Sequence, residues 1–150
     1  GTSFNRVPTS GTARFSGFSS VGVADTATAE GALLIGTANI SVNFATGATS
    51  GVLADFHGQR NGADVRYAGT IGLNSGNLAG LRANDRAVSY SGTLAGDGNT
   101  LIMSPTDIAA KFLKTPVAAF ATVNRVGSDP RHQWNGQPHQ TIVSFWTERD

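Results

Sequence analysis

The side chains best suited to bind a ligand or a partner gather in one polar segment, GSDPRHQWNGQPHQ (residues 127–140). His132 and His139 carry imidazole nitrogens that could ligate a metal or a haem iron. Arg131 adds hydrogen-bond donors, and Trp134 offers the aromatic area that interface anchors use. The predicted binding residues are therefore Arg131, His132, Trp134 and His139.

The histidines do not predict a metal site. Zinc takes three or four ligands that converge at about 2.0–2.2 Å, and the spacing of His132 and His139 matches no recognisable zinc motif. His57, the third histidine, lies at the end of a separate predicted strand. Haem would need an axial histidine or tyrosine, but Tyr67 and Tyr90 lie beside glycines at strand centres, where packing in the core is expected. The sequence thus predicts no metal and no required cofactor, and leaves haem as an open alternative.

Catalytic motifs are missing from the sequence. A serine nucleophile elbow needs G-x-S-x-G, whereas GFSSVG (residues 17–22) is one residue longer and is expected to be a turn. Glycosidases need two acids about 5–10 Å apart, and most acids here lie beside predicted turns, where turn and cap roles are usual. Asp55 lies within a predicted strand and is expected to face solvent. We therefore expect that the protein is not an enzyme.

Composition excludes several other classes. The net charge is +1 and the eleven lysines and arginines are scattered, which gives no support to nucleic-acid binding. No apolar run approaches the roughly 18 residues of a transmembrane helix. The absence of cysteine removes disulfides, thiolate metal sites and a cysteine nucleophile. Only 14% of the residues are charged and 19 are glycine, a combination that suits short strands joined by tight turns.

Strands must position these side chains, because apolar residues alternate with polar ones along most of the chain. Within GTANISVNFATGATSG (residues 36–51), every second residue from Ala38 to Phe44 is apolar, which is typical of a half-buried strand. Asn61-Gly62 predicts a tight hairpin turn. The pattern gives eight or nine strands in one domain, residues 1–150, which begins with an N-terminal extension at 1–9. The predicted inward residues include Ala38, Ile40, Val42, Phe44, Val65, Tyr67, Val88, Tyr90 and Leu94.

Glycines at matching places in two predicted strands indicate that the sheet bends until it closes. YAGT (residues 67–70) and YSGT (residues 90–93) place a glycine two residues after an aromatic ring, on the same face. Such a glycine leaves room for a large neighbouring side chain and allows a sharp bend, and closure removes the exposed sheet edges. We therefore predict an all-β fold, a single antiparallel up-and-down β-barrel of eight (eight to nine) strands with one short helical turn.

The alternation changes near Ser104. SPTD (residues 104–107) fits a helix start, with Ser104 as N-cap and Pro105 in the first turn. The following IAAKFLK (residues 108–114) also alternates as a strand would, so both interpretations stay open. PVAAFA (residues 116–121) is where the short helical turn is expected, and residues 127–140 are expected to be a long polar loop before the final strand.

Four segments carry a resemblance to one known family. In chain order they are PTSGTARFSGF (residues 8–18), GTANISVNFATGATSG (36–51), YAGTI (67–71) and YSGTLAGDG (90–98). They resemble the β-barrel domain of bacterial transferrin-binding protein B and its relatives, in which a G-T-A-x-[FY]-x-G strand precedes a strand ending in [DN]-F and, after a short turn, S-G. Asn43-Phe44 and Ser50-Gly51 occupy those last places, and the resemblance covers most of residues 8–125.

The resemblance implies an exported, often lipid-anchored barrel of the bacterial outer membrane, cell surface or periplasm. It implies a non-catalytic protein that captures a host or environmental protein, haem or another ligand. Two features depart from the family. Ala110 and Lys114 stand where glycines are usual in AKFLKTPVA (residues 110–118), and the lipid-bearing cysteine is missing, which leaves anchoring open.

Two alternatives to a binding protein stay open, a structural subunit of a larger outer-membrane or extracellular assembly and a membrane-spanning eight-strand barrel. The membrane-spanning barrel can be distinguished by where the apolar side chains of the strands point. Apolar side chains that point inward indicate a barrel that does not cross lipid. For a binding protein, the contact surface is expected in loop 127–140, whose freedom Pro130 and Pro138 limit. Trp134 either anchors a partner there or folds back over the barrel end.

Overall fold

The computed structural model describes residues 8–25, 30–75, 85–114, 117–122 and 132–150, whose regular structure is all β-strand. Eight strands build a barrel: β1 (Thr12–Asp25), β2 (Glu30–Asn43), β3 (Thr49–Arg60), β4 (Ala63–Ser75), β5 (Asp85–Gly96), β6 (Asn99–Leu113), β7 (Ala119–Thr122) and β10 (Gln140–Arg149). A small hairpin of β8 (Gln133–Trp134) and β9 (Gln137–Pro138) is added at one end. The described residues include no helix that is long and apolar enough to cross a membrane.

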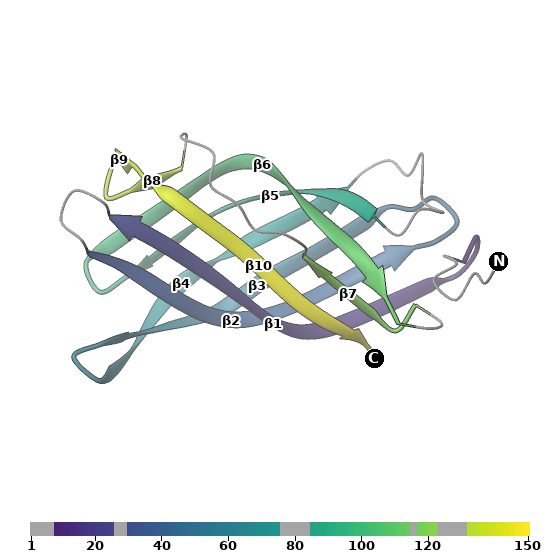
Figure 1. The fold of residues 1–150 in the computed structure, drawn as a ribbon, viewed down its shortest axis with the longest axis horizontal. Helices are drawn as coiled ribbons and strands as arrows, with labels where there is room; N and C mark the ends of the chain where they lie inside the picture. Colours follow the sequence, from purple (N-terminus) through teal and green to yellow (C-terminus); the bar gives the residue numbers. More distant parts are fainter. Residues whose placement is uncertain (1–7, 26–29, 76–84, 115–116, 123–131) are drawn as a thin grey trace.

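The eight strands close into one antiparallel barrel (Figure 1). Strands β1 to β6 pair with their neighbours in chain order, β6 pairs with β7, β7 with β10, and β10 with β1. The ladder between β1 and β10 runs from Phe15↔Arg149 to Ala24↔Gln140, so the first and last strands lie side by side. The prediction of a single eight-stranded antiparallel barrel is confirmed.

The inward face of the strands carries the apolar residues, as the alternation predicts. On β2, Ala38, Ile40 and Val42 are buried, whereas Asn39 and Ser41 are exposed. The other predicted inward residues are buried too, except Val65, which is half-buried and packs against the same core. The register of the predicted strands is therefore correct where these residues test it.

Phenylalanine rings fill one end of the interior, the end where β2 and β6 finish. The ring centroid of Phe112 lies 4.6 Å from that of Phe120, 6.0 Å from Phe44 and 6.2 Å from Phe15. Phe145 joins through Phe120, at 5.5 Å. All five rings are buried and tilted against one another, an arrangement that aromatic pairs favour over face-to-face stacking. We call these five residues the phenylalanine cluster.

Of the two interpretations left open after SPTD, the helix does not form, because residues 99–113 make the single strand β6. The ladder between β5 and β6 shifts register between Tyr90 and Gly92. Ser104 and Pro105 on β6 stand opposite the single residue Ser91, so β6 carries one extra residue. A bulge is one of the few places in a sheet that accept proline, which has no N–H for the ladder. The buried positions change from odd to even residue numbers across the bulge, so the strand interpretation of residues 108–114 is correct.

The short helical turn expected in PVAAFA is also wrong. Residues 119–122 form β7, the strand through which β6 and β10 are joined. Ala119, Phe120 and Ala121 are all buried, on both faces of the strand. A strand that is buried on both faces has no polar alternation, so its sequence does not separate it from a buried helical segment.

Two of the repeated glycines lie where the neighbouring backbone leaves no room for a side chain. A Cβ atom at Gly92 would overlap the carbonyl oxygen of Thr70, and one at Gly69 would overlap that of Thr93. Gly69 also has a φ of +106°, a backbone conformation that residues with a side chain rarely adopt. Glycine is therefore required at these two positions by a facing backbone carbonyl group, and not by a large neighbouring side chain.

Gly92→Ala is expected to lower the free energy of unfolding by about 1–3 kcal/mol, because β4 must move away to admit the methyl group. Gly72→Ala is the matched control: Gly72 lies on the paired strand, and a Cβ there meets no atom within 4 Å. Its effect should stay within about 0.5 kcal/mol. Urea unfolding followed by circular dichroism measures both, and equal stabilities would contradict the close approach of β4 and β5.

Candidate functional site

A pocket of about 560 Å³ opens at the barrel end opposite the phenylalanine cluster. It lies between the start of β2, the β3–β4 and β5–β6 turns and the β8–β9 hairpin. Small-molecule sites are typically roughly 300–1,000 Å³, and barrel mouths are a usual place for them. We call it the mouth pocket; its described lining residues are Ala32, Leu33, Leu34, Gly58, Gln59, Arg60, Val65, Tyr67, Asp97, Asn99, Trp134, Asn135, Gln137 and His139.

Three two-residue turns lie at this end of the barrel (Figure 1). Their φ angles show that they share one backbone conformation. In Asn61-Gly62, Asp97-Gly98 and Asn135-Gly136 the first residue has φ of 51°, 54° and 52°, and the glycine has φ of 80°, 76° and 80°. Positive φ at both central residues is the mark of a type I′ turn, whose twist matches paired strands and which favours Asn-Gly and Asp-Gly. The turn at Asn61-Gly62 is as predicted, whereas the third turn lies inside the expected loop.

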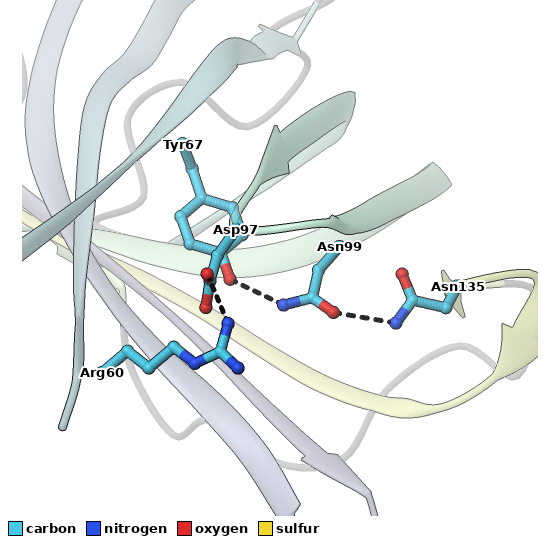
Figure 2. A network of polar contacts seen from close by, with 5 residues as sticks. All are labelled: Arg60, Tyr67, Asp97, Asn99 and Asn135. Carbon is cyan, nitrogen blue, oxygen red and sulfur yellow. Dashed lines mark hydrogen bonds and ion pairs between the residues drawn. The ribbon is translucent and has the colours of Figure 1, made fainter.

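Polar side chains from these turns and from β4 meet in the mouth (Figure 2). Asn135 donates a hydrogen bond from Nδ2 to Oδ1 of Asn99 (2.9 Å), and Asn99 donates from Nδ2 to the hydroxyl oxygen of Tyr67 (3.2 Å). Beside them, Nη1 of Arg60 lies 2.6 Å from Oδ1 of Asp97. The pocket wall therefore offers two oriented amides, a hydroxyl group and one ion pair whose charges balance.

The β8–β9 hairpin is tied to the start of β6. The main-chain N–H of Asn135 donates to the carbonyl oxygen of Thr100, and the N–H of Thr100 donates to Oδ1 of Asn135, both at 2.8 Å. Trp134 pairs with Leu101 in the ladder and is only 8% exposed. The expected loop at 127–140 is thus a hairpin over its described part. Trp134 folds back onto the core, so the interpretation of Trp134 as an exposed anchor is wrong.

The other predicted binding residues are divided between pocket and core. His139 lines the mouth pocket, and its Nδ1 donates a hydrogen bond to the carbonyl oxygen of Gln137 (2.9 Å). His132 is fully buried, with Nε2 2.9 Å from the hydroxyl oxygen of Tyr90. It is therefore a packed core residue and not a surface ligand. Arg131 lies outside the described residues.

His57 lies on the outer face of the barrel, away from the mouth pocket. Its Nδ1 is 2.9 Å from Oδ2 of Asp64 on the neighbouring strand. It does not end its strand as expected, because β3 continues to Arg60. Asp55 is exposed as predicted, and its Oδ1 lies 3.6 Å from Nη2 of Arg66. Within the described part of the chain, no group of three or more His, Cys, Asp or Glu residues could hold a metal ion.

Sequence reasoning missed most of the polar residues of the mouth pocket. They are Gln59, Arg60, Asp97, Asn99, Asn135 and Gln137. A signal for them was present in the turns, because each of these residues lies within two positions of an Asn-Gly or Asp-Gly pair. Counting back by two from an inward residue such as Leu101 also places Asn99 on the inner face of β6.

No protein-family model matches this chain, and it has no significant match among curated proteins or solved structures. The resemblance of residues 8–125 to transferrin-binding protein B barrels therefore stays a hypothesis that rests on the motifs.

Trp134→Ala is expected to lower the free energy of unfolding by about 3–5 kcal/mol, because the indole is packed in the core beneath the hairpin. Gln133→Ala is the matched control, since Gln133 is the neighbouring residue on β8 and is exposed. Its effect should stay within about 0.5 kcal/mol. Chemical denaturation measures both variants, and a small loss for Trp134→Ala would restore the exposed-anchor interpretation.

Proposed function

We propose that this protein is a non-catalytic binding module whose ligand site is the mouth pocket. The observation that carries the proposal is the meeting of a pocket of about 560 Å³ with the polar network of Tyr67, Asn99 and Asn135 at one end of the barrel. An eight-stranded barrel is wide enough either to be filled by side chains or to hold one small ligand. Here the phenylalanine cluster fills one end, and the pocket occupies the other.

The chemistry of the lining supports binding without catalysis. Asp97 is the only carboxylate among the described lining residues, and it is paired with Arg60. Hydrolysis of a glycosidic bond would need two carboxylates. Acyl transfer would need a nucleophile next to a base, and these lining residues include no serine, threonine or cysteine.

The direction of the side chains favours this proposal over the membrane-spanning alternative. Membrane-spanning barrels present apolar residues to lipid and have a polar interior. This barrel has an apolar interior, with residues such as Leu53 and Ile71 fully buried. Its outer face carries charged side chains, among them Arg66 and Asp55.

The resemblance to transferrin-binding protein B barrels extends the proposal to an exported protein of the bacterial surface, outer membrane or periplasm. Its partner would be a protein or a small ligand taken up at the mouth. Haem fits the lining less well than a polar ligand does. His132 and Tyr90 are hydrogen-bonded to each other in the core, and the hydroxyl group of Tyr67 accepts a hydrogen bond from Asn99.

Substitutions that fill the pocket test the proposal. Val65 is half-buried in the lining, so the indole of Val65→Trp would occupy part of the space, and Gln137→Trp would fill it from the hairpin side. Arg66→Trp is the matched control, because the next residue of a strand points to the opposite face. In saturation-transfer NMR with a library of water-soluble metabolites, we expect compounds that bind the wild type and Arg66→Trp but neither filled variant.

Circular dichroism and melting temperatures establish that the variants are folded. If the library contains no binder, or if every binder is retained by both filled variants, the mouth pocket is not the ligand site.

A second candidate function is a structural subunit of a larger assembly, and a strip of apolar residues on the outer face favours it. Phe18, Leu33, Ile35 and Ile142 are between 43% and 64% exposed on the adjacent strands β10, β1 and β2. Phe18 pairs with Trp146 in the ladder. Contiguous exposed apolar side chains mark interaction sites more often than isolated ones do. We call Phe18, Leu33, Ile35, Ile142 and Trp146 the apolar strip.

If the protein assembles through the apolar strip, Phe18→Ser with Ile35→Ser should abolish self-association in sedimentation-velocity runs at increasing concentration. Val52→Ser with Ile102→Ser is the control, because these residues are similarly exposed but lie outside the strip. A wild-type protein that stays monomeric, or a control that dissociates equally, would count against assembly through this face.

A further inference from the structure

The amide side chains of the mouth pocket keep hydrogen-bonding capacity that the protein itself does not use. A side-chain amide has two N–H donors and an oxygen with two lone pairs. Asn99 and Asn135 each use one donor and one lone pair, in the bonds to Tyr67, to Thr100 and to each other. The side chain of Gln137, exposed in the same lining, makes no hydrogen bond in the described structure. These three of the four side-chain amides in the lining thus each present a donor and an acceptor together.

The Arg60 and Asp97 charges in the described lining balance each other, so this pair favours neither an anionic nor a cationic ligand. Arg60 and Asp97 are joined at 2.6 Å, so an anionic ligand would compete with Asp97 and a cationic ligand with Arg60. His139 already donates from Nδ1 to the carbonyl oxygen of Gln137. A ligand hydroxyl group competes with neither Asp97 nor Arg60. It donates one hydrogen bond and accepts two, and the amides offer partners for both.

Apolar groups line the same pocket beside the amides. Trp134 and Leu34 are buried and form part of its inner wall, and Val65 is half-buried in it. Sugar rings combine hydroxyl groups with C–H faces, so they suit a wall that carries both amides and apolar side chains. We infer that the mouth pocket binds a neutral saccharide of monosaccharide or disaccharide size. This inference rests on the proposed function and names its ligand class.

A peptide segment would offer similar donors and acceptors through its backbone. Recognition of extended peptides, however, uses an open sheet edge or a long groove that pairs with the peptide main chain. The mouth pocket is concave and presents side-chain amides from separate elements, β6 and the β8–β9 hairpin. A compact polyhydroxylated ring therefore fits it better than an extended chain does.

Side-chain amide signals in a ¹H–¹⁵N correlation spectrum test the inference directly. The NH₂ groups of Asn99, Asn135 and Gln137 report on the pocket, and those of Gln133 and Gln140 lie outside its lining. The probes are neutral hexoses, N-acetylhexosamines and disaccharides, with a sugar phosphate, a fatty acid and a mixture of short peptides in parallel. We expect saturable shifts of the Asn99, Asn135 and Gln137 amides with at least one neutral saccharide, and no such shifts with the other probes.

Gln137→Ala should then weaken the binding of that saccharide about 3- to 10-fold, the effect of one lost hydrogen bond. Gln133→Ala is the matched control, because it removes an exposed amide from the same hairpin but outside the pocket lining, and it should leave the affinity unchanged. Equal affinities of the two variants would overturn the inference.

The two proposals fail in different ways. Saturable shifts of the pocket amides with only a charged, apolar or peptide probe would overturn the saccharide class and leave the mouth pocket as the ligand site. Pocket amides that no probe shifts would overturn the saccharide inference. The proposed function has its own test, because it is overturned by a metabolite screen that yields no pocket-dependent binder.

Discussion

Packing of the phenylalanine cluster is the interaction on which the rest of the barrel depends. Its rings come from both ends of the chain, since Phe15 lies on β1 and Phe145 on β10, and Phe120 on β7 contacts both. Burying each such side chain contributes about 1.5–3 kcal/mol, a large share of the stability of a domain this size. Pairing of the first and last strands therefore also brings the rings of the cluster together. Because that end supplies the packing, the other end can hold polar groups and a pocket.

The mouth pocket owes its shape to backbone geometry more than to apolar packing. Its borders are type I′ turns, whose φ values are fixed by Asn-Gly and Asp-Gly pairs. The same asparagine that begins the third turn, Asn135, ties the hairpin to Thr100 and orients Asn99. Side chains that are held in place before a ligand arrives lose less conformational freedom when it binds. The turns thus place the groups that the proposed function needs.

Local pattern was sufficient for the barrel and insufficient for its mouth. Residues such as Ile40 and Phe44 could be assigned to the core because strand periodicity is a property of neighbouring residues. Pro105 left helix and strand undecided because proline fits both a helix start and a bulge, and only the register against β5 decides between them. Trp134 could not be placed because its burial depends on Leu101, which lies on a strand far away in the chain. The pocket likewise depends on which turns share one barrel end.

The buried pair of His132 and Tyr90 connects the core to the pocket. Their hydrogen bond of 2.9 Å lies in the barrel interior, one step along the chain from the hairpin. A hairpin docked in another register would separate the two polar groups inside an apolar interior, and each unsatisfied group there costs about 1–3 kcal/mol. The pair therefore favours the one register in which Trp134 covers the core. In that register Gln137, which lies opposite Trp134 in the ladder, is brought to the pocket. A buried polar contact that adds little net stability can thus decide where the binding groups stand.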